Sequence, residues 1–329
     1  MAPGAGPSPP GAAAPQAPAP QAPRPLARRP LVRVKDLAWL VYLYPLRWLT
    51  GALPLPAAYA LWDALARVGA ALLRGPRRRL EARLQLAFPS PADRPRTGEI
   101  AADHFRRSIV RFGDDLLLPR LARERATRGT KLVHPEHLEA ALAGGRGALL
   151  VSGHFLASRA GRHHLAAIGH PAASVRNLAP RDAAAGLLGE RFVQPRYVDF
   201  LSRTIGDEIA ARATDSGLRI MARLRAGGLV DLHVDAAFSR EMVVREFLGA
   251  TYAFGAGAFH LAYLVGAPVV PIQCLGDSRR LTIEFFEPID PAGWPDRQAY
   301  AAAALDRSLR ILEQEIRAAP SQWDLWIRW

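Results

Sequence analysis

Short apolar runs that alternate with helical patterns constrain the fold of this chain more than any other feature. The first run, at residues 147–152, is continuous and begins with glycine, which is typical of a strand buried in a parallel sheet. Strands that alternate with helices predict an α/β domain with a mostly parallel central sheet flanked by helices. Further runs lie at residues 172–176, 229–235, 265–275 and 281–286, and helical patterns at 218–226, 258–264 and 300–318.

Two polar residues follow strands of this predicted sheet. His154 comes directly after the first run, within residues 152–155 (Ser-Gly-His-Phe), and Asp235 closes the run at 229–235. Ligands of parallel α/β sheets bind beyond the carboxyl ends of the strands, so we expect both side chains at the same edge. An imidazole there can take a proton from an attacking hydroxyl or amine. A single histidine is also compatible with a purely structural role.

The strand that ends at Asp235 carries three polar residues at alternate positions. Strand alternation places Asp231, His233 and Asp235 on one face. Asp235 would share a cleft with His154 if their two strands are near neighbours. The same spacing is compatible with a metal site or with structural polar contacts, and the sequence favours the structural contacts over a metal.

The chain begins with a low-complexity segment. Residues 1–32 are nearly all Ala, Pro, Gly and Gln with a few arginines, so we expect a disordered tail. The order of charged and apolar residues is not that of a signal peptide. We therefore expect the chain to keep this tail and its globular part to stay on the cytosolic side.

Residues 33–75 are the most apolar and aromatic part of the chain and include Trp39 and Trp48. Arg47 and Pro54 interrupt the apolar stretch, and aromatic residues mixed with arginine are typical of a membrane interface. We interpret this segment as membrane-associating amphipathic helices in the bilayer surface. A spanning anchor over residues 37–53 and an ordinary buried helical pair remain alternatives.

The net charge restricts the partners. The 43 Lys and Arg residues exceed the 30 Asp and Glu residues, which gives a net charge of +13. Such a surface suits an anionic membrane surface, a phosphorylated glycolipid or an acidic carrier protein. The cluster Arg74, Arg77, Arg78 and Arg79 could contact anionic headgroups or form a solvated helix face. No nucleic-acid-binding module is recognisable, so we expect no nucleic-acid partner.

Cysteine usage excludes other classes of site. Cys274 is the only cysteine, which excludes a disulfide framework and a thiolate metal cluster. It lies within an apolar run, so we expect a buried, inert thiol.

Several segments, in order, carry a family resemblance. After the apolar amino-terminal part, the segments are residues 84–89, 137–147, 152–155, the strand ending in Asp235, and residues 247–249, 266–272 and 320–329. From residue 37 to 329 the chain resembles the bacterial lipid A biosynthesis acyltransferases (lauroyl and myristoyl transferases), within the lysophospholipid acyltransferase-like superfamily. The resemblance implies that residues 76–329 form an acyltransferase-like α/β domain.

The resemblance also implies an activity. The enzyme would move a fatty acyl chain from a thioester of acyl carrier protein or CoA to a hydroxyl or amine of a membrane lipid or glycolipid. The reaction would take place at the cytoplasmic face of the inner membrane, with no cofactor or metal and with His154 as general base. Arg176 stands where the family keeps an arginine; it could hold a phosphate, polarise the thioester or be a surface residue. Gly153, Arg159 and Arg176 are the candidate substrate-binding residues.

One position departs from the family pattern. The family places an acid five residues after the histidine, and Arg159 stands there in this chain. A guanidinium cannot accept a hydrogen bond from imidazole, and its charge disfavours imidazolium. We expect Asp235 to replace the missing acid, and Arg159 to face outward or to bind an acceptor phosphate. The alternative is a catalytically silent relative that binds a lipid or a carrier protein.

Overall fold

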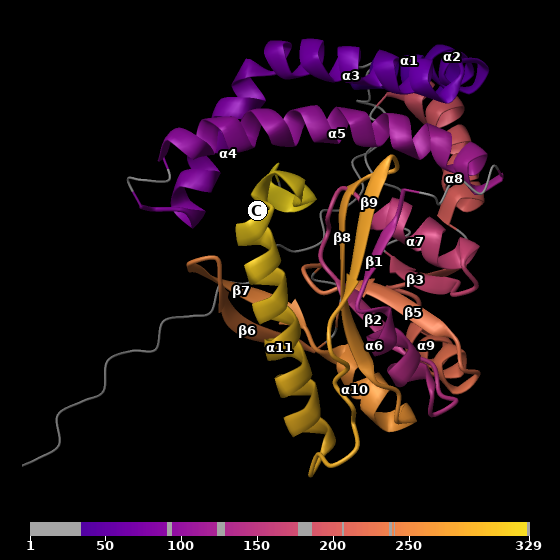
Figure 1. Cartoon of the computed structure of the whole chain (residues 1–329), viewed down its shortest axis with the longest axis vertical. Helices are drawn as coiled ribbons and strands as arrows, with labels where there is room; N and C mark the ends of the chain where they lie inside the picture. The colour runs from indigo at the N-terminus through magenta and orange to yellow at the C-terminus, as the bar shows by residue number, and fades with distance from the viewer. Residues whose placement is uncertain are drawn as a thin grey trace, which may run out of the picture.

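A parallel sheet lies at the centre of the molecule (Figure 1). The structure, a computed structural model, describes residues 34–90, 94–123, 129–176, 186–205, 207–236, 239 and 241–327. The tail predicted at residues 1–32 lies outside these residues. Within the described part, seven strands form the sheet in the order β1-β9-β8-β2-β5-β3-β4. They are β1 (Lys131–Val133), β2 (Leu149–Ser152), β3 (Ala172–Arg176), β4 (Glu208–Ala210), β5 (Leu229–His233), β8 (Val269–Asp277) and β9 (Arg280–Phe285).

The sheet is mostly parallel, as predicted. Every neighbouring pair in it runs parallel except β8 and β9, which form an antiparallel hairpin. All four residues of β2 are buried, because β2 lies between β5 and β8 and helices cover both faces of the sheet. The predicted α/β class with a mostly parallel central sheet is therefore confirmed.

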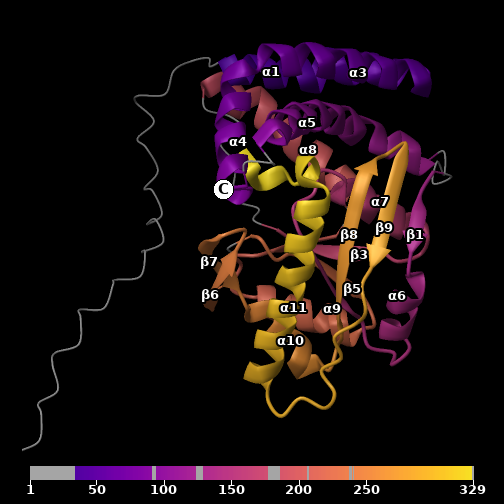
Figure 2. The same cartoon turned by 60° about the vertical axis from the view of Figure 1, so that its left-hand side comes forward.

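Successive residues of β2 face two different apolar cores. Leu149 and Val151 pack with α9, α10 and α11, whereas Leu150 packs with α6 and α7 on the other face. Figure 2 shows α11 and α6 on opposite sides of the sheet. The helices are α6 (Pro135–Leu142), α7 (Ser158–Ala167), α9 (Ser216–Arg225), α10 (Gly257–Val265) and α11 (Arg297–Ala318).

A layer of helices covers one end of the sheet (Figure 1). Its inner side contains an aromatic cluster around Tyr42 and Trp62. The Tyr42 hydroxyl donates to the Phe112 carbonyl at 2.9 Å, and the Trp62 indole donates to Thr50 Oγ1 at 3.0 Å. The helices are α1 (Val34–Val41), α2 (Arg47–Ala52), α3 (Leu55–Leu72), α4 (Arg74–Ala87), α5 (Arg94–Arg123) and α8 (Gln194–Ile205), with π-helical turns at Tyr42–Leu46 and Gly189–Val193.

The amino-terminal helices only partly match the sequence-based interpretations. None of the described helices combines the length and the apolar character needed to cross a bilayer. The aromatic cluster gives these helices a buried side, yet Trp48, Val68 and Leu72 are exposed on them. Membrane association of residues 33–75 stays a prediction.

Some elements differ from the sequence-based prediction. The apolar run 265–275 begins with the end of α10, and β8 starts only at Val269. Gly266, with a φ of 72°, ends the helix in the left-handed conformation that glycine adopts easily. The hairpin of β6 (Met242–Phe247) and β7 (Ala250–Gly255) was not predicted as strands, and neither were β1 and β4. Cys274 is buried as expected, and burial raises the pKa of its thiol to about 12.

The α5 carboxyl Asp114 generates a prediction about stability. Burial, and after it the charge of Asp277, raises the pKa of Asp114 to about 8. Between about pH 4 and pH 8 the unfolded chain loses this proton while the folded chain keeps it, so stability falls as pH rises. Asp114→Asn cannot ionise and should flatten this fall. We expect its Tm at pH 8 to exceed that of the parent by about 2 °C or more.

The measurement is thermal unfolding of both proteins from pH 4 to pH 8. Asp306→Asn removes a carboxyl from a surface ion pair with Arg245 and is the matched control, because such pairs contribute little to stability. An Asp114→Asn curve parallel to that of the parent would contradict the prediction.

Candidate active site

The register of β2 and β5 brings His154 and Asp235 together. The two strands are parallel neighbours, and Ser152 lies opposite His233. His154 follows Ser152 by two residues, and Asp235 follows His233 by two. His154 Nδ1 lies 2.6 Å from Asp235 Oδ1. The backbone N–H of His154 donates to Asp235 Oδ2 at 2.8 Å. The strand ends therefore place a carboxylate directly against the imidazole.

The Asp235 carboxylate is fully buried and carries a third hydrogen bond, from the Trp323 indole to Oδ2 at 2.8 Å. Burial is the largest influence on its pKa and raises it. The charge of His154 and the hydrogen bonds from this residue outweigh burial, so the pKa of Asp235 lies below its ordinary value. The carboxylate is thus ionised near neutral pH.

An ionised Asp235 fixes the state of the His154 ring. Because the carboxylate only accepts, His154 Nδ1 must carry the proton and donate it to Oδ1. When the ring is neutral, the other ring nitrogen, Nε2, holds the lone pair. The His154 side chain is 24% exposed, so a substrate can approach the ring. The arrangement can therefore abstract a proton from a substrate group.

A second histidine lies against the first. The His233 ring packs edge-on against His154, with centroids 4.1 Å apart. Its Nε2 is buried without a hydrogen-bond partner among the described residues. Burial, and after it His154, holds the pKa of His233 well below its usual range. A neutral His233 adds no like charge beside a protonated His154.

Of the three polar residues on and just after β5, two lie against His154 and one does not. Asp231 accepts a hydrogen bond from Arg162 Nε at 3.0 Å, His233 contacts His154, and Asp235 binds His154. The carboxylates of Asp231 and Asp235 therefore have different partners.

Gly153 occupies a position where a side chain does not fit. A Cβ there would lie 2.4 Å from Leu312 Cδ1 and 3.2 Å from Asp235 Oδ2. The missing side chain lets the loop pass close to the carboxylate. This packing accounts for the glycine, and its contact with substrate stays a prediction.

Arg159 stands at the sequence position of the family's motif acid, and the expectation that it faces outward is wrong. It lies on α7 and forms an ion pair with Asp115 of α5, and both side chains are largely buried. The carboxylate at the imidazole comes from Asp235 instead. The role of Arg159 in substrate binding stays a prediction.

Arg176 closes β3 and forms an ion pair with Glu208 of β4. Burial lowers the pKa of Arg176, and the charges of Arg159 and Arg162 lower it further. The charge of Glu208 acts in the opposite direction and raises it. The three arginines therefore act on one another electrostatically. Arg162 was missed from the sequence, although it lies three positions after Arg159 and so on the same side of α7.

Trp323 was also missed as a member of the site. The sequence gives it only as part of the carboxyl-terminal segment that carries the family resemblance. Nothing local to the segment indicates that its indole reaches Asp235, 88 positions away.

The Arg159–Asp115 pair generates a prediction. Arg159→Glu would restore the family's acid but would place a second carboxylate beside the buried Asp115. We expect it to lower the free energy of unfolding by about 3–5 kcal/mol, the usual cost of breaking a buried ion pair. Denaturant unfolding measures this loss, and combining Arg159→Asp with Asp115→Arg should recover part of it. Unchanged stability of Arg159→Glu would contradict the prediction.

Comparisons with known proteins place the chain in a family. The family described as bacterial lipid A biosynthesis acyltransferase matches residues 28–329. No curated protein matches the sequence. Among solved structures, the chain is similar to the 1-acyl-sn-glycerophosphate (LPA) acyltransferase PlsC from Thermotoga maritima, at 13% identity over 87% of this chain and 97% of that one. The TM-score is 0.39, too low to support a conclusion. Because the family match spans nearly the whole sequence, the chain belongs to the bacterial lipid A biosynthesis acyltransferase family.

Proposed function

We propose that this acyltransferase moves a fatty acyl chain from a thioester donor to a hydroxyl or amine of a membrane lipid or glycolipid. The donor is the acyl thioester of acyl carrier protein or of CoA. Family membership makes the chain a lipid acyltransferase. The hydrogen-bonded pair of His154 and the buried Asp235 carries the proposal for its mechanism. The pair supplies a base at the edge of the sheet where ligands of parallel α/β sheets bind.

The proposed reaction has two proton transfers. His154 Nε2 takes the proton of the acceptor hydroxyl or amine as that group attacks the thioester carbonyl carbon. When the tetrahedral intermediate collapses, the carbon–sulfur bond breaks, and the imidazolium returns the proton to the leaving thiolate. Asp235 stays ionised throughout, holds the ring and stabilises its charged form.

The substrates carry negative charge that the surrounding arginines can bind. Both an acyl carrier protein and CoA bear phosphate, and so do many membrane lipids. We assign Arg159 and Arg176 as phosphate-binding residues and Gly153 as a residue that contacts substrate. The mutual influence of Arg159, Arg162 and Arg176 supports the assignment, and a phosphate would compete with the carboxylate that each of them already binds.

The alternative is a catalytically silent relative that binds a lipid or a carrier protein. Its basis is the absence of an acid at position 159. The contact between His154 and Asp235 weakens this basis, because a carboxylate reaches the ring from another strand. We therefore favour the active enzyme.

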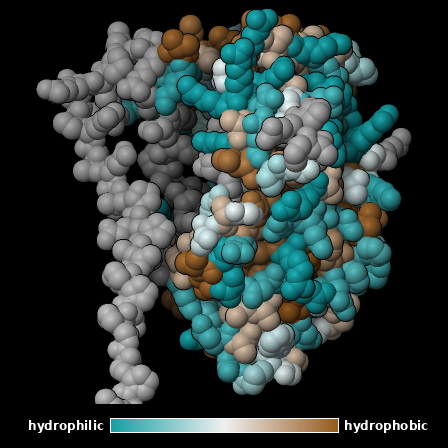
Figure 3. Space-filling model, turned by 90° about the vertical axis from the view of Figure 1, so that its left-hand side faces the viewer, coloured by the Kyte–Doolittle hydropathy of each residue, from teal (hydrophilic) through white to brown (hydrophobic). Residues whose placement is uncertain are grey.

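We assign the enzyme to the cytoplasmic face of the inner membrane, and the amino-terminal layer supports its association with a membrane. Large apolar side chains are exposed on the helices of this layer, and Figure 3 shows hydrophobic residues at the upper edge of the molecule. Such exposed apolar surface marks an interaction site. We call these residues the apolar face: Val34, Leu37, Val41, Trp48, Leu49, Val68 and Leu72.

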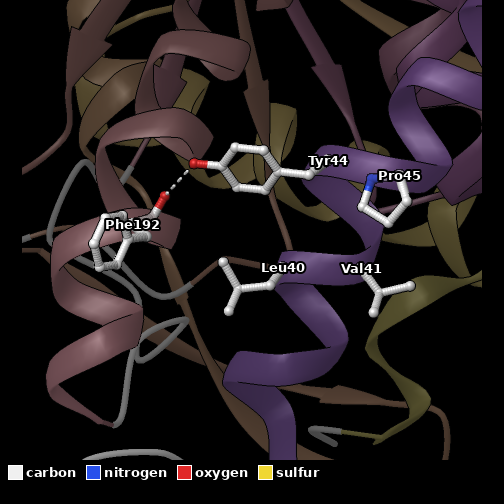
Figure 4. A pocket seen from close by; sticks show the side chains of 5 residues that line it. All are labelled: Leu40, Val41, Tyr44, Pro45 and Phe192. Carbon is white, nitrogen blue, oxygen red and sulfur yellow. Dashed lines mark hydrogen bonds between the residues drawn. The ribbon is translucent and has the colours of Figure 1, made fainter.

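We assign a shallow, open groove that adjoins the apolar face to lipid tails. It has a volume of about 420 Å³ and lies between α1, with the π-helical turn that follows it, and Phe192 (Figure 4). The Tyr44 hydroxyl donates to the Phe192 carbonyl at 3.3 Å and closes one side. Exposed arginines of α4, such as Arg74, Arg78 and Arg79, could contact anionic headgroups. The lining residues are Leu40, Val41, Tyr44, Pro45 and Phe192.

Substitutions in the pair test the mechanism. We expect His154→Ala to abolish acyl transfer, because the ring that takes the proton of the acceptor is lost. Asp235→Asn should lower the rate by about 10²-fold or more, the usual loss of acid–base support. The assay measures the transfer of radiolabelled palmitate to lipid extracted from bacterial membranes. The donor is palmitoyl-CoA or palmitoyl-acyl carrier protein. Full activity of either variant would refute the mechanism, and an inactive parent in every combination would favour the silent relative.

Substitutions in the apolar face test membrane association. Trp48→Glu should lower the affinity for anionic phospholipid vesicles, measured by co-sedimentation, by about tenfold or more. The reason is that a charge replaces an apolar side chain that would be buried in lipid. Val244→Glu, at an exposed apolar position on β6, is the matched control and should bind like the parent. Equal binding by all three proteins would contradict the proposal.

A further inference from the structure

We infer that Trp323 is a positioning residue for the His154–Asp235 pair, and that the carboxyl-terminal segment is part of the active site. The inference rests on the proposed function, because a positioning residue needs a reaction to support. The segment consists of two short 3₁₀ helices, Pro320–Gln322 and Asp324–Ile327, with Trp323 between them.

The first argument is the contact with the carboxylate. The Trp323 indole N–H donates to Asp235 Oδ2 at 2.8 Å, on the oxygen that also accepts the His154 backbone N–H. The Asp235 side chain has no solvent contact, so solvent cannot replace a lost donor directly. A buried carboxylate that loses a hydrogen bond holds its proton more tightly.

The second argument is that the same segment holds the loop that carries His154. The backbone N–H of Asp324 donates to the His154 carbonyl at 2.7 Å, and the N–H of Leu156 donates to the Gln322 carbonyl at 2.9 Å. Phe155 and Trp323 form an antiparallel bridge between these hydrogen bonds. The segment therefore fixes both the backbone of the imidazole and the carboxylate that orients it.

The segment is itself firmly anchored. Trp323 and Trp326 are fully buried, and their rings meet edge to face with centroids 4.8 Å apart. Phe247, at the end of β6, packs against the Trp323 ring at 6.3 Å. Arg83 of α4 donates to the Trp326 carbonyl at 2.9 Å. The indole N–H of Trp323 is thus held in place before any substrate arrives.

A neutral donor suits this position. An arginine or lysine in its place would also stabilise the carboxylate, but its positive charge beside the ring would oppose protonation of His154. An indole supplies one N–H and no charge. It therefore keeps Asp235 ionised and disfavours the imidazolium less than a full positive charge would.

The test compares two tryptophans of one cluster in the full-length enzyme. Trp323→Phe keeps an aromatic ring and removes the N–H to Asp235. Trp326→Phe removes an N–H that donates to the Pro320 carbonyl at 2.6 Å, and serves as the matched control. Both should lower Tm, because both lose buried packing and a hydrogen bond. Only Trp323→Phe should change the pH dependence of acyl transfer.

The readout is kcat/KM for the palmitoyl thioester as a function of pH. The His154–Asp235 pair of Trp323→Phe should take up a proton at a pH about half a unit or more above that of the parent. The acidic limb of the profile therefore shifts to higher pH. We expect kcat to fall by about tenfold while KM changes by less than about twofold. Trp326→Phe should keep the acidic limb of the parent.

Two results would overturn the inference: an unchanged acidic limb in Trp323→Phe, or an equal shift in both variants. If Trp323→Phe does not fold, a benzothienyl analogue of tryptophan at position 323 replaces the N–H by sulfur in a ring of nearly the same shape and permits the same comparison. Failure of the proposed function is distinguishable, because His154→Ala would then retain activity whatever the behaviour of Trp323→Phe.

Discussion

The buried carboxylate of Asp235 is the interaction on which the candidate site depends. A carboxylate without solvent contact is costly unless its oxygens are hydrogen-bonded. Three N–H groups meet this demand: the ring and the backbone of His154, and the indole of Trp323. Because the carboxylate is ionised, the imidazole keeps its proton on Nδ1 and presents the lone pair of Nε2 outward. The position of Asp235 after β5 and the Trp323 indole of the carboxyl-terminal segment therefore determine the tautomer of His154 together.

The departure from the family pattern at position 159 changes the origin of the acid. In this chain the helix after His154 carries an arginine that pairs with Asp115 of α5, so α7 is tied to the amino-terminal layer. The acid comes instead from β5, the parallel neighbour of β2. Matching positions just beyond two adjacent parallel strands lie close together, which makes this a rigid source for the carboxylate.

The amino-terminal layer shows why composition leaves its role open. Its inner side holds aromatic residues such as Tyr42 and Trp62, and its outer side exposes apolar residues such as Trp48 and Leu72. A helix that is apolar on both sides can bury one side and expose the other, so the sequence leaves a buried helical pair open beside the favoured interfacial helices. The structure shows which side chains are buried and which form the apolar face.

The sequence by itself determined the α/β class, most strands and helices, and the two site residues that follow β2 and β5. Hydrophobic periodicity is a local property, and β3 has the predicted bounds. The three-residue strands β1 and β4 are too short to show a period. Only the tertiary structure decided the strand order, the partner of Arg159 and the reach of Trp323. These contacts join residues far apart in the chain, such as His154 and Asp235 at 81 positions, and depend on how the layers pack.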